Sequence, residues 1–301
     1  MSIFKKKDEK KMKTILIPVD FSDGSLNSCK YALYISGKEK VSLHLYHIYN
    51  DQVMIPDSSF PSGLDTDTFF NADIILALKD QAERSMHELV DSLEEYIKKE
   101  KLQATISFSL EGGDPQWEIT EAIKETQPDF VVMGTRGTGK KGFLEGHMAE
   151  KIMRKAYVPV LAVPENFTDF SLSNILYLTN FNPMDIYTIE RIFSLLNTKV
   201  FKLHVYHLVF NDNNKKAGLL MQEIEKAFDK EKKENKINFS IINTNNKQET
   251  LNKISKENNI DMIALLSEKK HSFKDLFSSH EIREKDLFEL KLPVIELHTT
   301  I

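Results

Sequence analysis

An internal repeat constrains the fold of this chain more than any other feature of its 301 residues. Residues 43–48 (LHLYHI) recur as residues 203–208 (LHVYHL), so that His44 aligns with His204 at an offset of 160. Later apolar segments match at a shorter offset of 132, at which Asp129 aligns with Asp261. The repeat indicates two domains built on one plan, the second copy being shorter after its second strand.

Each copy alternates short apolar segments, typical of buried strands, with amphipathic helical segments. In the first copy we expect strands at residues 14–19, 41–48, 104–110, 130–133 and 158–163, and helices at 25–37, 72–101 and 114–126. In the second copy we expect strands near residues 175–179, 200–209, 238–243, 261–266 and 294–298. This alternation predicts the α/β class: two tandem doubly wound, five-stranded parallel-sheet (Rossmann-like) domains, at residues 12–166 and 172–301.

Five of the eleven glycines lie in one run between a predicted strand and a helical segment: Gly134, Gly137, Gly139, Gly142 and Gly146. Glycine lets backbone N–H groups approach a ligand closely, and a helix N-terminus behind the run adds a partial positive charge. The run therefore predicts a phosphate site at the carboxyl ends of the strands, where Asp20 ends the first strand. Two plainer interpretations stay open: the run as a flexible connection, and Asp20 as a turn or helix-capping residue.

The totals exclude several classes of protein. A net charge of −5 gives no general nucleic-acid footprint. The single cysteine, Cys29, allows no internal disulfide and is expected to be a small packing residue. No apolar run is long enough to span a membrane, and the first residues lack the apolar core of a signal peptide. We expect a cytoplasmic protein with neither a membrane nor a nucleic acid as partner.

No catalytic motif is evident in the sequence, which lacks a G-x-S-x-G elbow, an H-E-x-x-H pair and a P-loop. His44 and His47, like their second-copy counterparts, lie three residues apart on a strand and point to opposite faces, which favours packing over metal binding. Trp117 is expected to be a core or interface anchor. Residues 50–70 form a long connection, interpreted either as a lid or as a disordered insertion.

Several motifs together identify a family. They are residues 18–22 (PVDFS) after the first strand, 47–48 (HI) closing the second, 113–115 (GDP) before the third helix, 128–134 (PDFVVMG) entering the glycine run, and 158–163 (VPVLAV) in the last strand. With this ordered set the chain resembles a tandem-type universal stress protein (UspA-like). The resemblance covers residues 12–165 and, more faintly, 172–298.

The resemblance implies that the two halves pack as a pseudo-dimer, with their final strands near the pseudo-twofold axis. It also implies binding of ATP or another adenine nucleotide, with Mg²⁺ accompanying it. Asp20 and Ile48 map to the nucleoside side of such a site. Gly134, Gly137, Gly146 and His147 map to the phosphate side, and the expected site is completed by Pro18, Val19, Met133 and Arg136.

Two departures from the family pattern G-x2-G-x9-G-[ST] bear on function. Gly137 and Gly146 have eight residues between them, and His147 replaces the hydroxyl residue. In the second copy Asn180 replaces the strand-end aspartate, and residues 266–274 contain no glycine, which predicts a degenerate copy.

The expected function is a stress-response regulatory protein, not an enzyme, that binds an adenine nucleotide in its N-terminal domain. The alternative is an interaction protein that has lost nucleotide binding. Slow ATP hydrolysis is a third and lower-ranked interpretation. Protein partners and a homodimer are further expectations.

Overall fold

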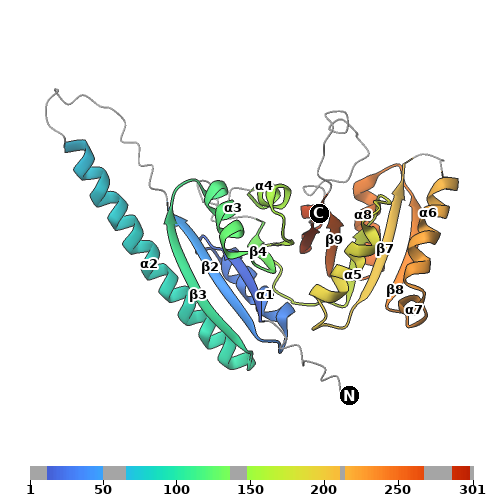
Figure 1. The fold of residues 1–301 in the computed structure, drawn as a ribbon, viewed down its shortest axis with the longest axis horizontal. Helices are drawn as coiled ribbons and strands as arrows, with labels where there is room; N and C mark the ends of the chain where they lie inside the picture. Colours follow the sequence, from blue (N-terminus) through green and yellow to red (C-terminus); the bar gives the residue numbers. More distant parts are fainter. Residues whose placement is uncertain (1–11, 50–65, 136–147, 211–213, 268–286, 299–301) are drawn as a thin grey trace, which may run out of the picture.

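The computed structural model describes residues 12–49, 66–135, 148–210, 214–267 and 287–298, with the backbone alone for 66–72 and 214–215. The described strands form one ten-stranded sheet in the order β3-β2-β1-β4-β5-β10-β9-β6-β7-β8 (Figure 1). The strands of the first half are β1 (Lys13–Pro18), β2 (Val41–Tyr49), β3 (Ala104–Gly112), β4 (Phe130–Gly134) and β5 (Val160–Val163). Those of the second half are β6 (Asn174–Leu178), β7 (Lys202–Val209), β8 (Ile237–Asn243), β9 (Met262–Leu266) and β10 (Val294–Leu297).

The predicted fold class is confirmed. Within each half all the strand pairs are parallel, and the strand order is the same in both halves when each is read from its outer edge. The halves join through an antiparallel pair, in which Val294, Ile295 and Glu296 of β10 face Ala162, Leu161 and Val160 of β5. The final strands of the two copies therefore pair directly, and the pseudo-dimer has one continuous sheet.

Helices cover both faces of the sheet, as a doubly wound fold requires. One face carries α1 (Asp23–Ser36), α2 (Thr66–Glu100), α5 (Asp185–Leu195) and α6 (Asn214–Ala227). The other face carries α3 (Pro115–Thr126), α4 (Met148–Lys155) and α8 (Lys247–Glu257). The short helix α7 (Asp229–Lys233) follows α6 beside β8. Because both apolar clusters include strand residues from the two halves, burial on each face is shared across the whole sheet.

Local chemistry explains where the helices begin and end. Ser22 caps α1 by accepting from the Ser25 N–H, and Gly37 ends it at φ 59°, where a Cβ would come within 3.3 Å of Thr198. Asp114 caps α3, and Pro115 occupies its first turn. The helix α2 begins at Thr66 instead of residue 72, so the end of the predicted loop is helical; residues 50–65 lie outside the described part.

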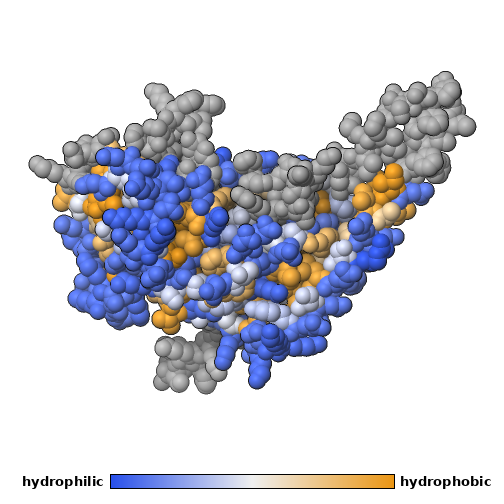
Figure 2. Space-filling model, turned by 180° about the vertical axis from the view of Figure 1, so that it is seen from behind, coloured by the Kyte–Doolittle hydropathy of each residue, from blue (hydrophilic) through white to orange (hydrophobic). Residues whose placement is uncertain are grey.

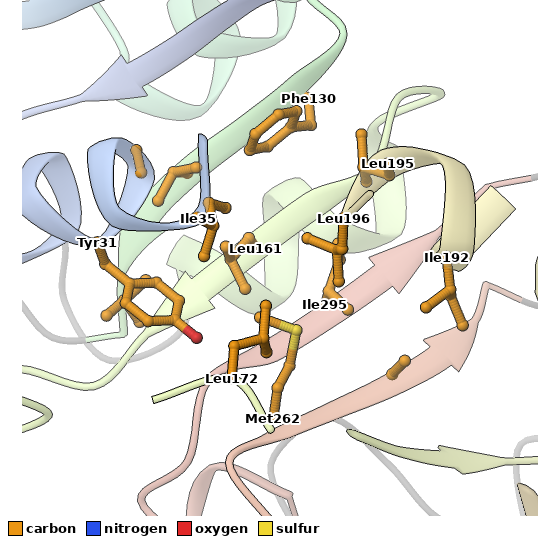
Figure 3. Packing of buried hydrophobic residues seen from close by; sticks show 14 of the residues in the cluster. Tyr31, Ile35, Phe130, Leu161, Leu172, Ile192, Leu195, Leu196, Met262 and Ile295 are labelled. Atoms are coloured by element: carbon orange, nitrogen blue, oxygen red, sulfur yellow. The ribbon is translucent and has the colours of Figure 1, made fainter. Parts of the chain in front are cut away.

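Polar contacts also tie the halves together. The Asn27 side-chain amide donates to the Pro164 and Phe167 carbonyls, 3.2 and 2.8 Å away, and so holds the connection that leaves β5. The Lys13 ammonium donates to the Leu195 carbonyl at 2.9 Å. Apolar side chains from both halves fill the space between these contacts (Figure 3). The junction is thus a packed core and not a flexible tether.

An aspartate serves the same structural role in both copies. Asp129 accepts from the Thr14 N–H at 2.8 Å. Its counterpart Asp261 accepts from the Ser173 and Asn174 N–H groups and from the Ser171 hydroxyl. Each carboxylate therefore ties the start of its copy's first strand to the start of the neighbouring strand. This explains an aspartate of the 128–134 motif in purely structural terms.

Two single residues test the sequence expectations. Cys29 is fully buried, and burial raises the pKa of its thiol to about 12, which confirms a packing role. Trp117 is 63% exposed, because its position on α3 faces away from the sheet, so the core alternative is wrong and the interface alternative stays a prediction. Figure 2 shows a largely hydrophilic rear surface, with apolar residues gathered over the N-terminal part of α2. Ile74 and Leu76 of this helix are 39% and 57% exposed.

Replacement of Asp261 by alanine should lower the free energy of unfolding by about 2 kcal/mol, because three donors lose their acceptor. Urea denaturation measures the change. Asp229→Ala, which removes an exposed carboxylate on α7, is the control and should leave the stability nearly unchanged. Equal effects of the two variants would contradict the assigned role.

A second prediction concerns the Tyr31 hydroxyl, which lies in the apolar cluster shared by the two halves. It is fully buried with no hydrogen-bond partner among the described residues (Figure 3), and burial raises the pKa of the phenol. Tyr31→Phe removes only this oxygen, so the free energy of unfolding should stay the same or rise by about 1 kcal/mol. A thermal-shift and urea series measures it. A clear loss of stability would show that the hydroxyl has a partner.

Candidate functional site

The candidate site lies where the strand order changes direction. The first strand, β1, lies between β2 and β4, so the connections that leave β1 and β4 diverge at their carboxyl ends. Ile15 pairs with Phe130, and four residues further along the two strands Val19 lies level with Gly134. Crevices at such switch points are the usual ligand sites of open α/β sheets.

The sequence prediction placed ten residues at this site, and the structure brings the described ones together at one edge. Pro18 ends β1, with Val19 and Asp20 directly after it, Ile48 lies near the end of β2, and Met133 and Gly134 end β4. The side chains of Val19, Ile48 and Met133 are buried in the two apolar clusters, so only their backbone groups could serve a ligand. The remaining four residues lie outside the described part of the chain: Arg136, Gly137, Gly146 and His147.

Asp20 is held by the start of α1. Its Oδ1 accepts from the Ser22 and Ser25 hydroxyls, each at 2.5 Å, and from the Ser22 N–H at 3.2 Å, while its own N–H donates to Ser25 Oγ. The side chain is only 8% exposed. These contacts support the turn interpretation, since Ser22 is the residue that caps α1. They also orient the carboxylate at the switch point, so a ligand role remains compatible with them.

A strained turn precedes α1. Phe21 has a φ of 61°, a conformation that costs energy for a bulky side chain. Its ring lies 4.3 Å from that of His47, whose Nδ1–H donates to the Val19 carbonyl at 2.8 Å. Burial lowers the pKa of His47, which favours the neutral ring with this tautomer. An aromatic contact and a hydrogen bond therefore both hold the turn between β1 and α1 in this strained conformation.

The same turn recurs in the second half. Phe181 has a φ of 59°, its ring lies 4.2 Å from that of His207, and His207 Nδ1–H donates to the Thr179 carbonyl at 2.8 Å. Sequence reasoning did not assign this turn to Phe21 and His47. The signal was available, because both residues recur at the offset of 160 although the second copy has lost its glycines.

The carboxylate stands at a different position in the second copy. Asp185 aligns with Ser25, and it accepts from the Tyr177 and Thr179 hydroxyls while only 1% exposed. Burial raises the pKa of Asp185, and the two hydroxyl donors oppose this rise. In the first half the carboxylate belongs to the strand end, and in the second half it is buried on the helix. Asn180, at the strand end of the second half, is exposed.

The histidine pairs do not form a metal site. His44 contacts the Ser107 and Ser109 hydroxyls of β3 through its two ring nitrogens, while His47 turns to the other face. In the second half His204 contacts Asn174 Oδ1 and the Tyr206 hydroxyl. The described residues contain no group of three or more His, Cys, Asp or Glu side chains that could hold a metal ion.

The fold and the switch-point edge define a class: a tandem α/β protein whose halves pair through their last strands. Comparison with known proteins names the family. The Universal stress protein family matches residues 11–164. Universal stress protein MJ0531 of Methanocaldococcus jannaschii is 32% identical over 152 residues, which cover 50% of this chain and 81% of that protein.

The chain belongs to the Universal stress protein family. Two solved structures share the full two-half fold. A universal stress protein from Archaeoglobus fulgidus has a TM-score of 0.63 at 18% identity, covering 95% of this chain and 96% of its own. A putative universal stress protein from Pseudomonas aeruginosa has a TM-score of 0.54 at 11% identity, covering 95% and 93%. Among the described helices, none has the length and hydropathy needed to cross a membrane.

His204 provides a pH-dependent test of the second half. Burial lowers its pKa from 6.5 to about 4, with Lys202 adding to the effect, so folding favours the neutral ring. The stability that depends on neutral His204 should be complete above pH 6.5 and should be lost as the pH falls toward about 4. His204→Gln should therefore lose less stability over this window, measured by urea denaturation at successive pH values.

The control is His87→Gln, because His87 is exposed on α2. This variant should keep the wild-type pH profile. An unchanged profile in His204→Gln would contradict the assignment of the acid sensitivity to His204.

Proposed function

We propose that this protein is a stress-response regulatory protein that binds an adenine nucleotide (ATP, ADP or AMP) at the switch point of its N-terminal half. The observation that carries the proposal is the convergence of Asp20, Ile48 and Gly134 at the carboxyl ends of three adjacent strands. These residues occupy the positions at which the family's motifs hold a nucleotide. Family membership supports the stress-response role.

The residues present suit the parts of such a ligand. A carboxylate accepts hydrogen bonds, so Asp20, oriented by Ser22 and Ser25, would accept from the nucleoside. The backbone near Ile48 would contribute a second contact. Phosphates, with Mg²⁺ accompanying them, would meet the glycine run, whose N–H groups precede the N-terminus of α4. His147 and Arg136 would add hydrogen bonds and positive charge.

The second half, within proposed boundaries of 172–301, would not bind nucleotide in the same manner. Its carboxylate is buried on α5 as Asp185, bonded to Tyr177 and Thr179, and its loop after β9 lacks glycine. We propose that this half supports the fold of the first half and offers surfaces to protein partners. Binding and regulation in the cytoplasm, without catalysis, is the role that this arrangement suits.

The alternative is an interaction protein without nucleotide binding. One observation favours it: eight residues separate Gly137 from Gly146 where the family pattern has nine. A missing residue reorients several N–H groups at once. Recovery of the same protein partner with and without nucleotide would favour this alternative.

Isothermal titration with ATP, ADP and AMP tests the main proposal. Wild-type protein should bind at least one of them, and Gly137→Val should abolish binding, because a branched side chain cannot follow a path that requires glycine. Co-purifying nucleotide, identified by mass spectrometry, would be independent support.

Gly218→Val is the matched control. Gly218 lies on α6 of the second half with open space around its Cα, so the same change there should leave binding unchanged. Absence of heat and of a thermal shift at millimolar nucleotide would reject the proposal. Phosphate release well above that of Gly137→Val would instead revive slow hydrolysis.

A further inference from the structure

A side chain of the second half contacts the helix that follows the glycine run. His298, directly after β10, places Nε2 2.6 Å from the Met153 carbonyl of α4, and the imidazole is only 8% exposed. A carbonyl can only accept, so Nε2 carries the proton in this contact. This hydrogen bond crosses the boundary between the two halves.

The acceptor lies at a place where a helix needs a donor. Met153 is in the last turn of α4, which ends at Lys155, and the last carbonyls of a helix have no partner within it. The Ile152 carbonyl accepts from the Ala156 N–H at 2.8 Å. A donor such as His298 at the next carbonyl completes the C-terminal cap and suits the negative end of the helix dipole.

The histidine is specific to the second copy. Pro293 aligns with Pro159, and in this alignment His298 stands where the first copy has Pro164. Glu296, also buried, stands where the first copy has Ala162. Buried polar side chains are costly unless they are bonded, and the contact of His298 with the Met153 carbonyl has no counterpart at Pro164.

We infer that His298 is a positioning residue. Through its hydrogen bond to the last turn of α4, the second half fixes this helix, whose N-terminus follows the glycine run on the proposed phosphate side of the first half. This inference rests on the proposed function. The helix α4 has eight residues, roughly 12 Å at 1.5 Å per residue, and begins directly after His147. The degenerate half thus contributes to the nucleotide site without touching the nucleotide.

Two variants and two readouts test the inference. His298→Leu removes the donor, and His298→Gln keeps an N–H at a similar reach. Without nucleotide, amide hydrogen exchange in residues 148–156 should accelerate in His298→Leu and remain close to wild type in His298→Gln. ATP titration should show affinity about fivefold weaker in His298→Leu and restored in His298→Gln, as expected for the loss of one buried hydrogen bond.

Lys13→Met is the matched control. It removes another hydrogen bond between the halves, to the Leu195 carbonyl, at the opposite end of β1 from the site. It should change neither exchange in α4 nor ATP affinity.

Unchanged exchange in α4 of His298→Leu would overturn the inference, as would faster exchange with unchanged ATP affinity. Wild-type protein that fails to bind any adenine nucleotide would reject the proposed function instead. The exchange comparison would then still show whether His298 holds α4.

Discussion

The antiparallel pairing of β5 with β10 is the contact on which the architecture depends. Only three residue pairs form it, yet it joins two five-stranded parallel sheets into one sheet of ten strands. Because β5 and β10 run antiparallel, the two halves are related by an approximate twofold rotation, and their helices lie on the same two faces of the sheet. Both apolar clusters then extend across the junction, so separating the halves would expose core side chains to water.

The same pairing gives the second half a structural role in the first. Residues 266–274 of the second half contain no glycine, but its last strand completes the sheet beside β5. Hydrogen bonds of Lys13 with the Leu195 carbonyl and of His298 with the Met153 carbonyl then join the two halves directly. Asp185 stands where the first half has Ser25, and it is buried on α5 with the Tyr177 and Thr179 hydroxyls, whereas the first half keeps its carboxylate, Asp20, at the end of its first strand.

The order of elements followed from periodicity, and so did their approximate bounds. Buried parallel strands are continuous apolar runs, which is why β1 and β4 could be predicted closely. The start of α2 at Thr66 was missed, because a segment rich in polar residues extended a helix whose packing begins later. The core alternative for Trp117 was wrong, because the size of an aromatic residue does not show which way its helix face points.

For the candidate site, the sequence alone indicated Asp20 and the glycine run, because few other patterns place N–H donors and a carboxylate directly after buried strands. The internal repeat by itself likewise implied two copies of one fold. The sequence did not predict which distant residues contact one another. The contacts of Phe21 with His47 and of His298 with Met153 depend on which strands lie side by side. These contacts join residues far apart in the chain, and no local pattern encodes them; burial of both sheet faces brings them together.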